Sequence, residues 1–348
     1  MLLTDVLVLN IVLFVMKKIS IKDIAKEVGV SVASVSIVLS NKNENKRVSK
    51  PIADKIKQKA KELNYQPNRL ARSLRSGKSY TVGLLVADIS NSFFAQLAKY
   101  VQLEVEKSGY ASIVLNTDED PERARKMVEL LSSRQVDGVI MVPTVGSESL
   151  VCNLIERHIP LVLVDRFFPG LAIDSVTIEN MKAAYQITTY LLMKDHRKRP
   201  VFVVYDKAVS NLIEREQGYR KAMIELGLQD YIKVIKISYD HTKEDIQKKL
   251  GALLEKPRFF DAFVFATDNL AIEGLSYLAQ CKIDYGHEIG IACFDKCVAY
   301  DFLPVKIPYI AQPIQAMGEK AVKALLDRID KGVAHKGEAL ILEADFVF

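Results

Sequence analysis

The 348-residue sequence predicts an all-α head joined to an α/β core of two doubly wound parallel-sheet subdomains. Up to residue 79, apolar residues recur at helical spacing in short segments that Gly, Ser and Asn separate. From Tyr80 onward, near-continuous apolar runs of strand length alternate with helical segments, which is typical of buried parallel strands. The number of such runs, about eight, favours two sheets over one. The expected strands are Val82–Val86, Ala111–Leu115, Gly138–Val142, Leu161–Val164, Val201–Tyr205, Ile232–Ile237, Ala262–Ala266 and Ile289–Phe294.

Three helices are expected in the head. Ser20 and Asp23 have the spacing of a capping box, Gly29 permits a tight turn, and Ser31 is placed to cap a second helix. Ser49, before Pro51, opens the third helix. The apolar positions expected to form the small core are Ile21, Ile24, Ala25, Val28, Val35, Val38, Leu39, Ile52, Ile56, Ala60 and Leu63. Two helices joined by a turn that contains Gly indicate a helix-turn-helix.

A further short basic helix is expected in the stretch NYQPNRLARSLRSGKS, where Leu70, Ala71 and Leu74 share one face. A helix of this length is not stable by itself in water. It therefore needs a partner, either a second copy of itself or a groove of DNA.

Charge is shared unevenly along the chain. Residues 17–79 carry 16 Lys and Arg against 5 Asp and Glu, whereas residues 80–348 carry 32 against 37. A basic head on a mildly acidic body is typical of proteins that bind the phosphate backbone. Binding to a membrane surface would also suit this charge, but the ordered helix-turn-helix spacing argues against it.

Three motifs carry a resemblance to LacI/GalR-family transcriptional regulators: IKDIAKEVGVSVASVS, LNYQPNRLARSL and GLLVADISNSFF. The resemblance extends from about Lys17 to the C-terminus. It implies a cytoplasmic homodimer that binds double-stranded operator DNA with pseudo-palindromic sequence, most often as a repressor. It also implies a periplasmic-binding-protein-like core, in which a small-molecule effector, a sugar or sugar derivative, controls operator affinity.

The domain boundaries follow from the motifs and the resemblance together. We expect an apolar extension over 1–16, a helix-turn-helix domain over 17–66, a hinge helix and linker over 67–79, and an effector-binding and dimerisation core over 80–348. Within the core, the first subdomain is expected to comprise about 80–178 and 310–332. The second is expected to comprise about 179–309 and 333–348.

The resemblance assigns DNA contacts residue by residue. Base reading in the major groove falls on Val32, Ala33 and Ile37. Relatives often have Arg where Ile37 stands, and apolar side chains can contact thymine methyl groups but cannot pair with guanine. The positions matching phosphate contacts are Ser31, Ser34, Ser36, Ser40 and Ser49. The positions matching the minor-groove hinge are Asn68, Arg69, Ala71, Arg72 and Leu74. Leu74 is the expected wedge between base steps, with simple helix packing as its alternative role.

Polar residues that directly follow predicted strands are candidates for ligand binding, because ligands of doubly wound folds sit at the carboxyl ends of the strands. Carboxylates, a guanidinium group and aromatic rings suit a ligand rich in hydroxyl groups. By resemblance, the effector-contact positions are Phe94, Asp165, Arg215, Thr267 and Asp295. Thr267 stands where relatives often have Asn, and Ser92 replaces a frequent Pro, so the identity of the sugar stays open.

Several residues near these positions have simpler expected roles. Asp268 is expected to cap a helix, and Phe93 to belong to the core. Arg215 is expected just before the helix that follows Tyr205. Tyr239 or Asp240 is a further candidate from the loop after the sixth strand.

Other classes of protein find less support. The sequence has no GxGxxG after the first strand, no nucleophile elbow and no complete phosphate loop, so an enzyme is not expected. The four Cys and five His form no cluster of metal-ligand spacing, and no metal or other cofactor is expected. A solute-binding protein for transport would share the core, but the head argues against it. The apolar stretch over residues 1–15 lacks the features of a signal peptide and is short for a membrane span. We expect a start codon assigned too far upstream or a disordered extension, and a membrane-tethered regulator is the alternative interpretation.

Overall fold

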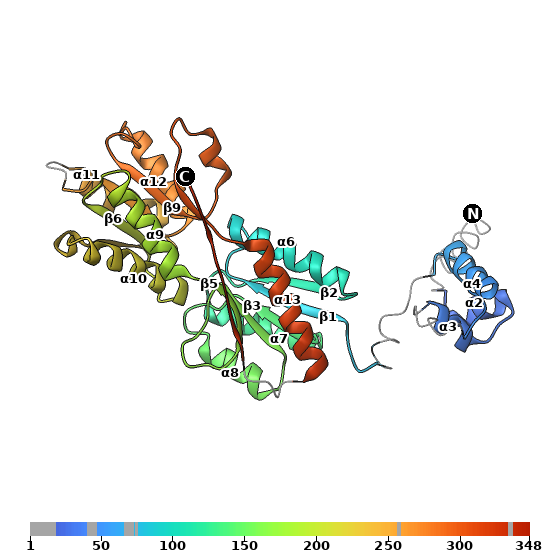
Figure 1. The fold of residues 1–348 in the computed structure, drawn as a ribbon. Coiled ribbons are helices and arrows are strands. Elements are labelled where there is room, and N and C mark those ends of the chain that lie inside the picture. The colour runs from blue at the N-terminus through green and yellow to red at the C-terminus, as the bar shows by residue number, and fades with distance from the viewer. Residues whose placement is uncertain (1–18, 40–46, 66–72, 74–75, 256–258, 333–336) are drawn as a thin grey trace, which may run out of the picture. The chain divides into compact units, whose positions relative to one another are not determined.

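The computed structural model describes residues 19–39, 47–65, 73, 76–255, 259–332 and 337–348. The chain forms two compact units, Met1–Ser79 and Tyr80–Phe348, and each is described by itself (Figure 1). None of the helices in the described part of the chain has the length and apolarity that a membrane span needs.

In its described residues, the first unit contains three helices that pack together, α2 (Ile21–Val28), α3 (Val32–Leu39) and α4 (Lys50–Glu62). The expected capping box is confirmed, because the Ser20 amide donates to Asp23 Oδ2 at 2.8 Å and the Asp23 amide donates to Ser20 Oγ at 3.4 Å. Gly29 ends α2 with φ at 73°, in the left-handed region. Ile24, Val35 and Ile56 are fully buried at the centre of the small core.

One core position of the head differs from the expectation. Ile52 is 39% exposed, and Ala53 is buried instead. The buried side of α4 is the row Ala53, Ile56 and Ala60. At about 100° per residue, Ile52 lies at the edge of this row, about 100° from Ala53, and faces solvent.

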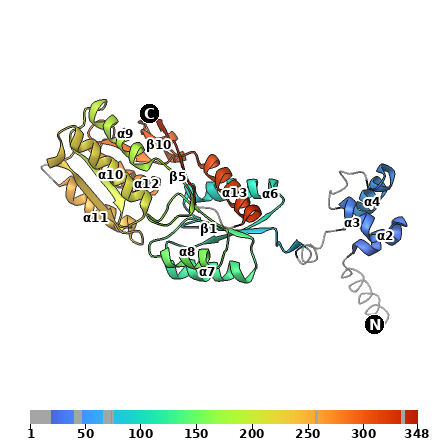
Figure 2. The same ribbon diagram turned by 60° about the horizontal axis from the view of Figure 1, so that its bottom comes forward.

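The second unit is built on two six-stranded sheets (Figures 1 and 2). The strands of the first sheet, in spatial order, are β11 (Ala339–Leu342), β5 (Asp174–Ile178), β4 (Leu161–Val164), β3 (Gly138–Met141), β1 (Thr81–Val86) and β2 (Ala111–Asn116). The strands of the second are β12 (Asp345–Val347), β10 (Tyr309–Ala311), β9 (Gly290–Phe294), β8 (Ala262–Phe265), β6 (Pro200–Tyr205) and β7 (Lys233–Ile237). All eight expected strands are present, and every pairing is parallel except that of β10 with β12.

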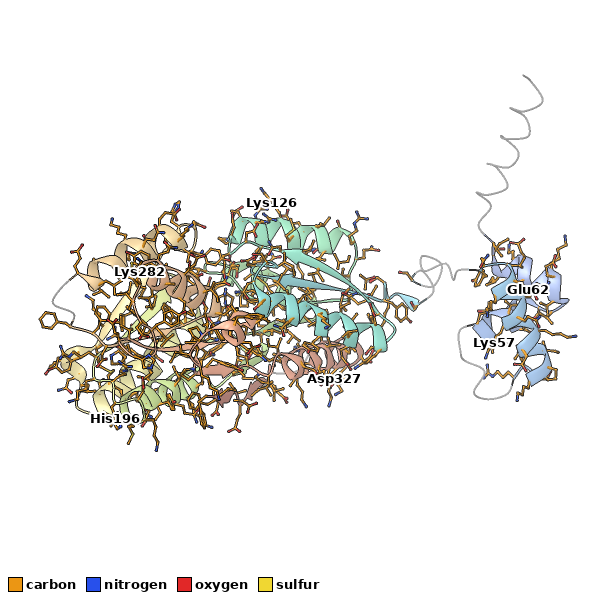
Figure 3. All side chains as sticks on the ribbon, turned by 90° about the horizontal axis from the view of Figure 1, so that it is seen from above. Lys57, Glu62, Lys126, His196, Lys282 and Asp327 are labelled. Carbon is orange, nitrogen blue, oxygen red and sulfur yellow. The ribbon has the colours of Figure 1, made fainter. Side chains whose placement is uncertain are left out.

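Helices cover both faces of each sheet, as in a doubly wound fold. The first sheet packs against α6 (Ser92–Lys107) and α13 (Ile314–Lys331) on one face, and α7 (Pro121–Ser133) and α8 (Glu148–Glu156) cover the other. The second sheet packs against α9 (Asn180–Met193) and α10 (Ser210–Glu225), with α11 (Thr242–Leu254) and α12 (Asp268–Gln280) on its opposite face. Two short 3₁₀ helices, Gln229–Tyr231 and Val298–Phe302, complete the unit. Charged side chains such as Lys126, Lys282 and Asp327 point outward from the core (Figure 3).

The chain crosses between the sheets three times. The first two crossovers follow Ile178 and Ala311. The expected third crossover near Gly332 is wrong, because β11 pairs with β5 in the first sheet and only β12 joins the second. Residues 339–342 therefore belong to the first subdomain, and the crossover lies between Leu342 and Asp345.

Candidate functional site

The start of α3 presents the residues expected to read bases. Val32 and Ala33 are exposed on the first turn of this helix, whereas Ile37 lies half-buried against the small core. Ser31 caps the helix, since its Oγ accepts from the Ser34 amide at 3.1 Å. Ser49 occupies the N-cap position of α4, but its side chain makes no capping hydrogen bond and is exposed.

Ser36 and Ser40 are two further residues that we expected to contact phosphate. Ser36 is half-buried on α3. Ser40 lies outside the described residues, as do the five expected hinge contacts, Asn68, Arg69, Ala71, Arg72 and Leu74. Their assignment to DNA stays a prediction.

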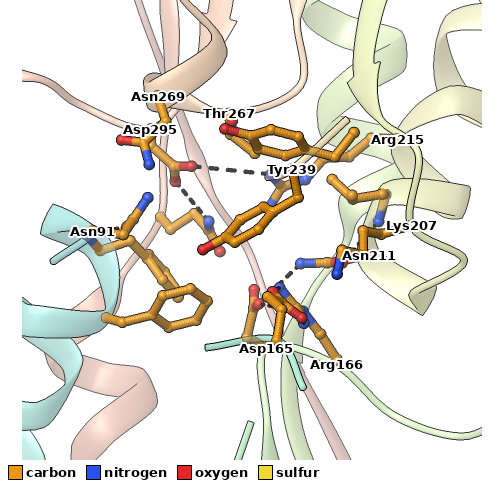
Figure 4. Close-up of a pocket in the computed structure, with 16 residues that line it drawn as sticks. Asn91, Asp165, Arg166, Lys207, Asn211, Arg215, Tyr239, Thr267, Asn269 and Asp295 are labelled. Atoms are coloured by element: carbon orange, nitrogen blue, oxygen red, sulfur yellow. Dashed lines mark hydrogen bonds and ion pairs between the residues drawn. The ribbon is translucent and has the colours of Figure 1, made fainter. Parts of the chain in front are cut away.

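A pocket lies between the two sheets of the core, at the carboxyl ends of their strands (Figure 4). It contains about 540 Å³ of empty space, part of it open to solvent. All five expected effector-contact residues line this one pocket: Phe94, Asp165, Arg215, Thr267 and Asp295. They come from five separate segments of the chain, so the sheet topology brings them together.

Asp165 follows β4 and is the centre of one polar cluster. Its side chain is almost fully buried, and its Oδ2 accepts from Asn211 Nδ2 at 2.9 Å. Arg166 binds Glu119 through both amino groups, at 2.9 and 2.6 Å, and places its Nε 3.5 Å from Asp165 Oδ2. Burial raises the pKa of Asp165, against the opposing effect of Arg166 and Arg215. These contacts tie the first subdomain to Asn211 on α10 of the second.

Arg215 is the centre of a second cluster. It lies in the second turn of α10, not before the helix as expected, and it is 1% exposed. Its Nε donates to Asn180 Oδ1 at 2.8 Å, and its Nη1 donates to the Ala266 carbonyl at 2.7 Å and lies 4.0 Å from Asp295 Oδ2. The guanidinium carbon also lies 4.1 Å from the centre of the Phe294 ring. Burial lowers the pKa of Arg215, and the nearby carboxylates oppose this effect.

Asp295 follows β9 in the second sheet as Asp165 follows β4 in the first. Both residues have positive φ, at 70° and 67°, a conformation that costs energy for most side chains and less for Asp and Asn. Asp295 Oδ1 accepts from Gln312 Nε2 at 2.6 Å. Burial raises the pKa of Asp295 to about 7, although Arg215 acts in the opposite direction. Both turns direct a buried carboxyl group into the pocket.

Hydrogen bonds also join the two subdomains beside the pocket. Tyr239 Oη donates to Asp88 Oδ2 at 2.9 Å, and Ser92 Oγ donates to Asp268 Oδ2 at 2.8 Å. The expected capping role of Asp268 is wrong, because Thr267 is the N-cap of α12 and accepts from the Leu270 amide. Asp268 instead holds the start of α12 to the start of α6.

The sequence did not point to several residues that complete the pocket, namely Glu119, Asn211, Asn269 and Gln312. It also did not point to Asn180, which lies outside the pocket lining and holds Arg215. Each has an amide or carboxyl group, but none directly follows an expected strand. Asn180 and Asn211 lie at the starts of α9 and α10, and Gln312 lies at the second crossover. Phe93 has the expected core role, with 5% exposure, and it also lines the pocket.

Comparisons with known proteins agree with this architecture. The family model for bacterial regulatory proteins of the lacI family matches residues 20–68, and the model for periplasmic binding proteins and the sugar binding domain of the LacI family matches residues 79–347. The HTH-type transcriptional regulator RegA of Clostridium saccharobutylicum is 30% identical over 318 residues, which are 90% of this chain and 93% of that protein. The ribose operon repressor of Halalkalibacterium halodurans is 31% identical over 316 residues, 90% of this chain and 91% of that protein.

A solved structure supports the same fold. The lac repressor dimer bound to operator superposes with a TM-score of 0.82 at 18% identity, and the match covers 95% of this chain and 98% of that one. The family model of the periplasmic binding proteins and LacI sugar-binding domain alone matches more than half of the sequence. The chain therefore belongs to the LacI family of bacterial transcriptional regulators, with a DNA-binding helix-turn-helix head and a core of the family's sugar-binding type.

Proposed function

We propose that this regulator is a repressor whose affinity for operator DNA is controlled by a sugar or sugar derivative bound in the pocket between the two sheets. The observation that carries the proposal is the convergence of Phe94, Asp165, Arg215, Thr267 and Asp295 on this pocket. The pocket combines hydrogen-bonding groups with aromatic rings, which suits a ring that carries hydroxyl groups.

On the DNA side, we propose that two copies of the chain bind a pseudo-palindromic operator. The first turn of α3 would enter the major groove with Val32 and Ala33 exposed. The hinge residues would pair over the centre of the operator and insert Leu74 into the minor groove. The dimer in the lac repressor structure supports the two-fold arrangement.

Coupling between the two sites follows from how the pocket is built. A ligand in the pocket would contact both subdomains, because Asp165 extends from the first sheet and Asp295 from the second. Ligand binding would therefore favour one relative setting of the subdomains over another. A coupling free energy of about 1–3 kcal/mol is typical, which corresponds to a change in operator affinity of about 5- to 150-fold.

A ligand screen tests the effector site. The full chain is heated with neutral sugars, sugar acids, sugar phosphates and nucleobases, since a ligand that binds only the folded state raises the melting temperature. A sugar that stabilises the wild type should do so far less in Asp165→Asn, because the substitution removes the buried charge and Asn tolerates the same positive φ. The matched control is Asp206→Asn, on the exposed loop after β6. A stabilising sugar whose effect is unchanged in Asp165→Asn would refute the assignment of the pocket.

The DNA contact of the hinge has its own test. Leu74→Ala should weaken binding to a selected operator at least tenfold, because the wedge is lost, while binding to random DNA at low salt stays nearly the same. Fluorescence anisotropy on both DNAs measures the two affinities. Equal loss on both DNAs would show that Leu74 only packs within its helix.

A further inference from the structure

The charges around the pocket are not balanced. Four carboxyl groups in or beside it are at most 7% exposed, and two guanidinium groups accompany them. The acidic residues are Glu119, Asp165, Asp268 and Asp295, and the basic residues are Arg166 and Arg215. Among the pocket-lining residues that the structure describes, the remaining cation is Lys207, which is half-buried with its Nζ 5.1 Å from the centre of the Tyr239 ring. Of the four buried carboxyl groups, Asp268 lies beside the pocket and the other three line it, against two buried guanidinium groups in the lining. Buried acidic groups therefore outnumber buried basic groups.

The protein already uses most of the guanidinium donors. Arg166 directs Nη1 to Glu119 and the Pro143 carbonyl and Nη2 to Glu119, while its Nε faces Asp165. Arg215 uses Nε and Nη1 for Asn180 and Ala266. Its Nη2 is buried and has no hydrogen-bond partner among the described residues. Arg166 Nε is likewise buried without a hydrogen-bond partner among the described residues, although it lies 3.5 Å from Asp165 Oδ2. The two guanidinium nitrogens left for a ligand therefore belong to different side chains, so neither arginine offers the paired contact that a carboxylate or phosphate prefers.

Acceptors, in contrast, are in excess. Burial raises the pKa of Asp295 to about 7, so above this pH its ionised carboxyl group offers about four lone-pair positions. Asp165 accepts from Asn211, and Asp295 accepts from Gln312, so each keeps capacity for further donors. Gln312 Oε1 is also buried without a hydrogen-bond partner in the described part of the chain. The pocket therefore suits a ligand that donates several hydrogen bonds through hydroxyl groups and accepts one from Arg215.

We propose that the pocket selects an uncharged polyhydroxylated ligand, a neutral sugar or polyol, and discriminates against sugar acids and sugar phosphates. This inference rests on the proposed function of the pocket as the effector site. An anionic group placed here would lie beside Asp165 and Asp295 in surroundings of low polarity, with no free pair of guanidinium donors to compensate it.

Matched ligands test this selectivity directly. Isothermal titration of the full chain at a pH above 7, where Asp295 is ionised, compares glucose with glucuronate and glucose 6-phosphate, galactose with galacturonate, and ribose with ribose 5-phosphate. At least one neutral sugar should bind at least tenfold more tightly than its anionic counterparts. Tighter binding of an acid or a phosphate than of the matched neutral sugar would overturn the selectivity and leave the pocket as an effector site. Binding of none of these sugars would overturn the proposed sugar effector, and the selectivity with it.

A charge variant tests the physical cause. Glu119→Gln removes the ionic partner of Arg166, so the affinity for sugar acids relative to neutral sugars should rise at least tenfold. The matched control is Glu122→Gln, which alters an exposed ion pair with Arg125 on α7. Thermal melting checks that both variants fold. If Glu119→Gln does not fold, the comparison of matched ligands on the wild type alone decides whether the pocket is selective. If Glu119→Gln folds and the ratio of sugar-acid affinity to neutral-sugar affinity is unchanged, the engagement of Arg166 by Glu119 is not the cause of the selectivity.

Discussion

Asp295 makes the stability of the core depend on pH in a predictable direction. Its carboxyl group is buried, with Gln312 as a hydrogen-bond donor and Arg215 4.0 Å away. Burial raises its pKa from 3.8 to about 7, more than Arg215 can offset. The perturbation to make is Asp295→Asn, which keeps an oxygen to accept from Gln312, tolerates positive φ, and does not titrate.

The size of the effect follows from this pKa. Between about pH 4 and about pH 7 the folded protein holds a proton on Asp295 that the unfolded chain releases, so the free energy of unfolding falls as pH rises through this range. Each tenfold change in proton affinity corresponds to about 1.4 kcal/mol. The wild type should therefore lose ~4 kcal/mol relative to Asp295→Asn between the two ends of the range.

Urea unfolding of wild type and variant at several pH values measures this difference. The chain has no Trp, so circular dichroism is the suitable signal. The control is Asp206→Asn, which removes an exposed carboxyl group of the same subdomain and should leave the pH dependence unchanged. If the free energies of unfolding of wild type and Asp295→Asn change in parallel from pH 4 to pH 7, Asp295 does not hold a proton in the folded protein over this range.

Three further substitutions test the packing and the caps. Gly218→Ala on α10 should lower the free energy of unfolding by about 1–3 kcal/mol, because an added Cβ would lie 2.2 Å from the Met181 carbonyl oxygen of α9; urea unfolding at neutral pH measures the loss, and an unchanged midpoint would contradict the close approach. Ser31→Ala removes the cap of α3 and should lower the stability of the head by about 1 kcal/mol, seen as earlier loss of helical dichroism on heating, whereas a cap without energetic value would leave the melting curve in place. Asn180→Ala leaves Arg215 Nε without its acceptor, so the free energy of unfolding should fall by about 1–3 kcal/mol and the ligand found by the screen should bind more weakly. If stability and ligand affinity are both retained, Arg215 does not need Asn180.

Local signals made the head predictable. The capping box at Ser20 and Asp23 and the left-handed Gly29 depend on neighbouring residues, and the structure shows both. The prediction that Ile52 is buried was wrong, because the buried side of α4 depends on how this helix packs against α2 and α3. A small rotation of the helix about its axis is enough to bury Ala53 and expose Ile52.

The sheets were predictable where the strands are long and apolar. The missed strand β5 contains Asp174 and Thr177, and β10 has three residues, so neither forms a continuous apolar run. The final apolar stretch, residues 339–348, contains β11 and β12 in different sheets. Hydrophobicity alone cannot assign two short edge strands to their neighbours, because strand pairing is set by tertiary packing.

The pocket was predictable in part. Asp165 and Asp295 directly follow strands, and the rule that ligands bind at the carboxyl ends of parallel strands identifies such residues. Asn211 enters the site from α10, and Asn180 on α9 acts on the site only through Arg215, so the packing of these two helices decides both contacts. The resemblance to the family identified Arg215 as an effector contact, but only the structure shows that this residue lies within α10.

The central claim is that a ligand in the pocket changes how tightly the head binds DNA. The most direct measurement starts from an operator selected from random DNA with the full chain, and determines its affinity without and with a saturating sugar found in the screen. We expect the operator affinity to change about 5-fold or more in either direction, and to stay the same when the sugar is added to Asp165→Asn. An operator affinity of the wild type that stays the same at saturating ligand would contradict the central claim.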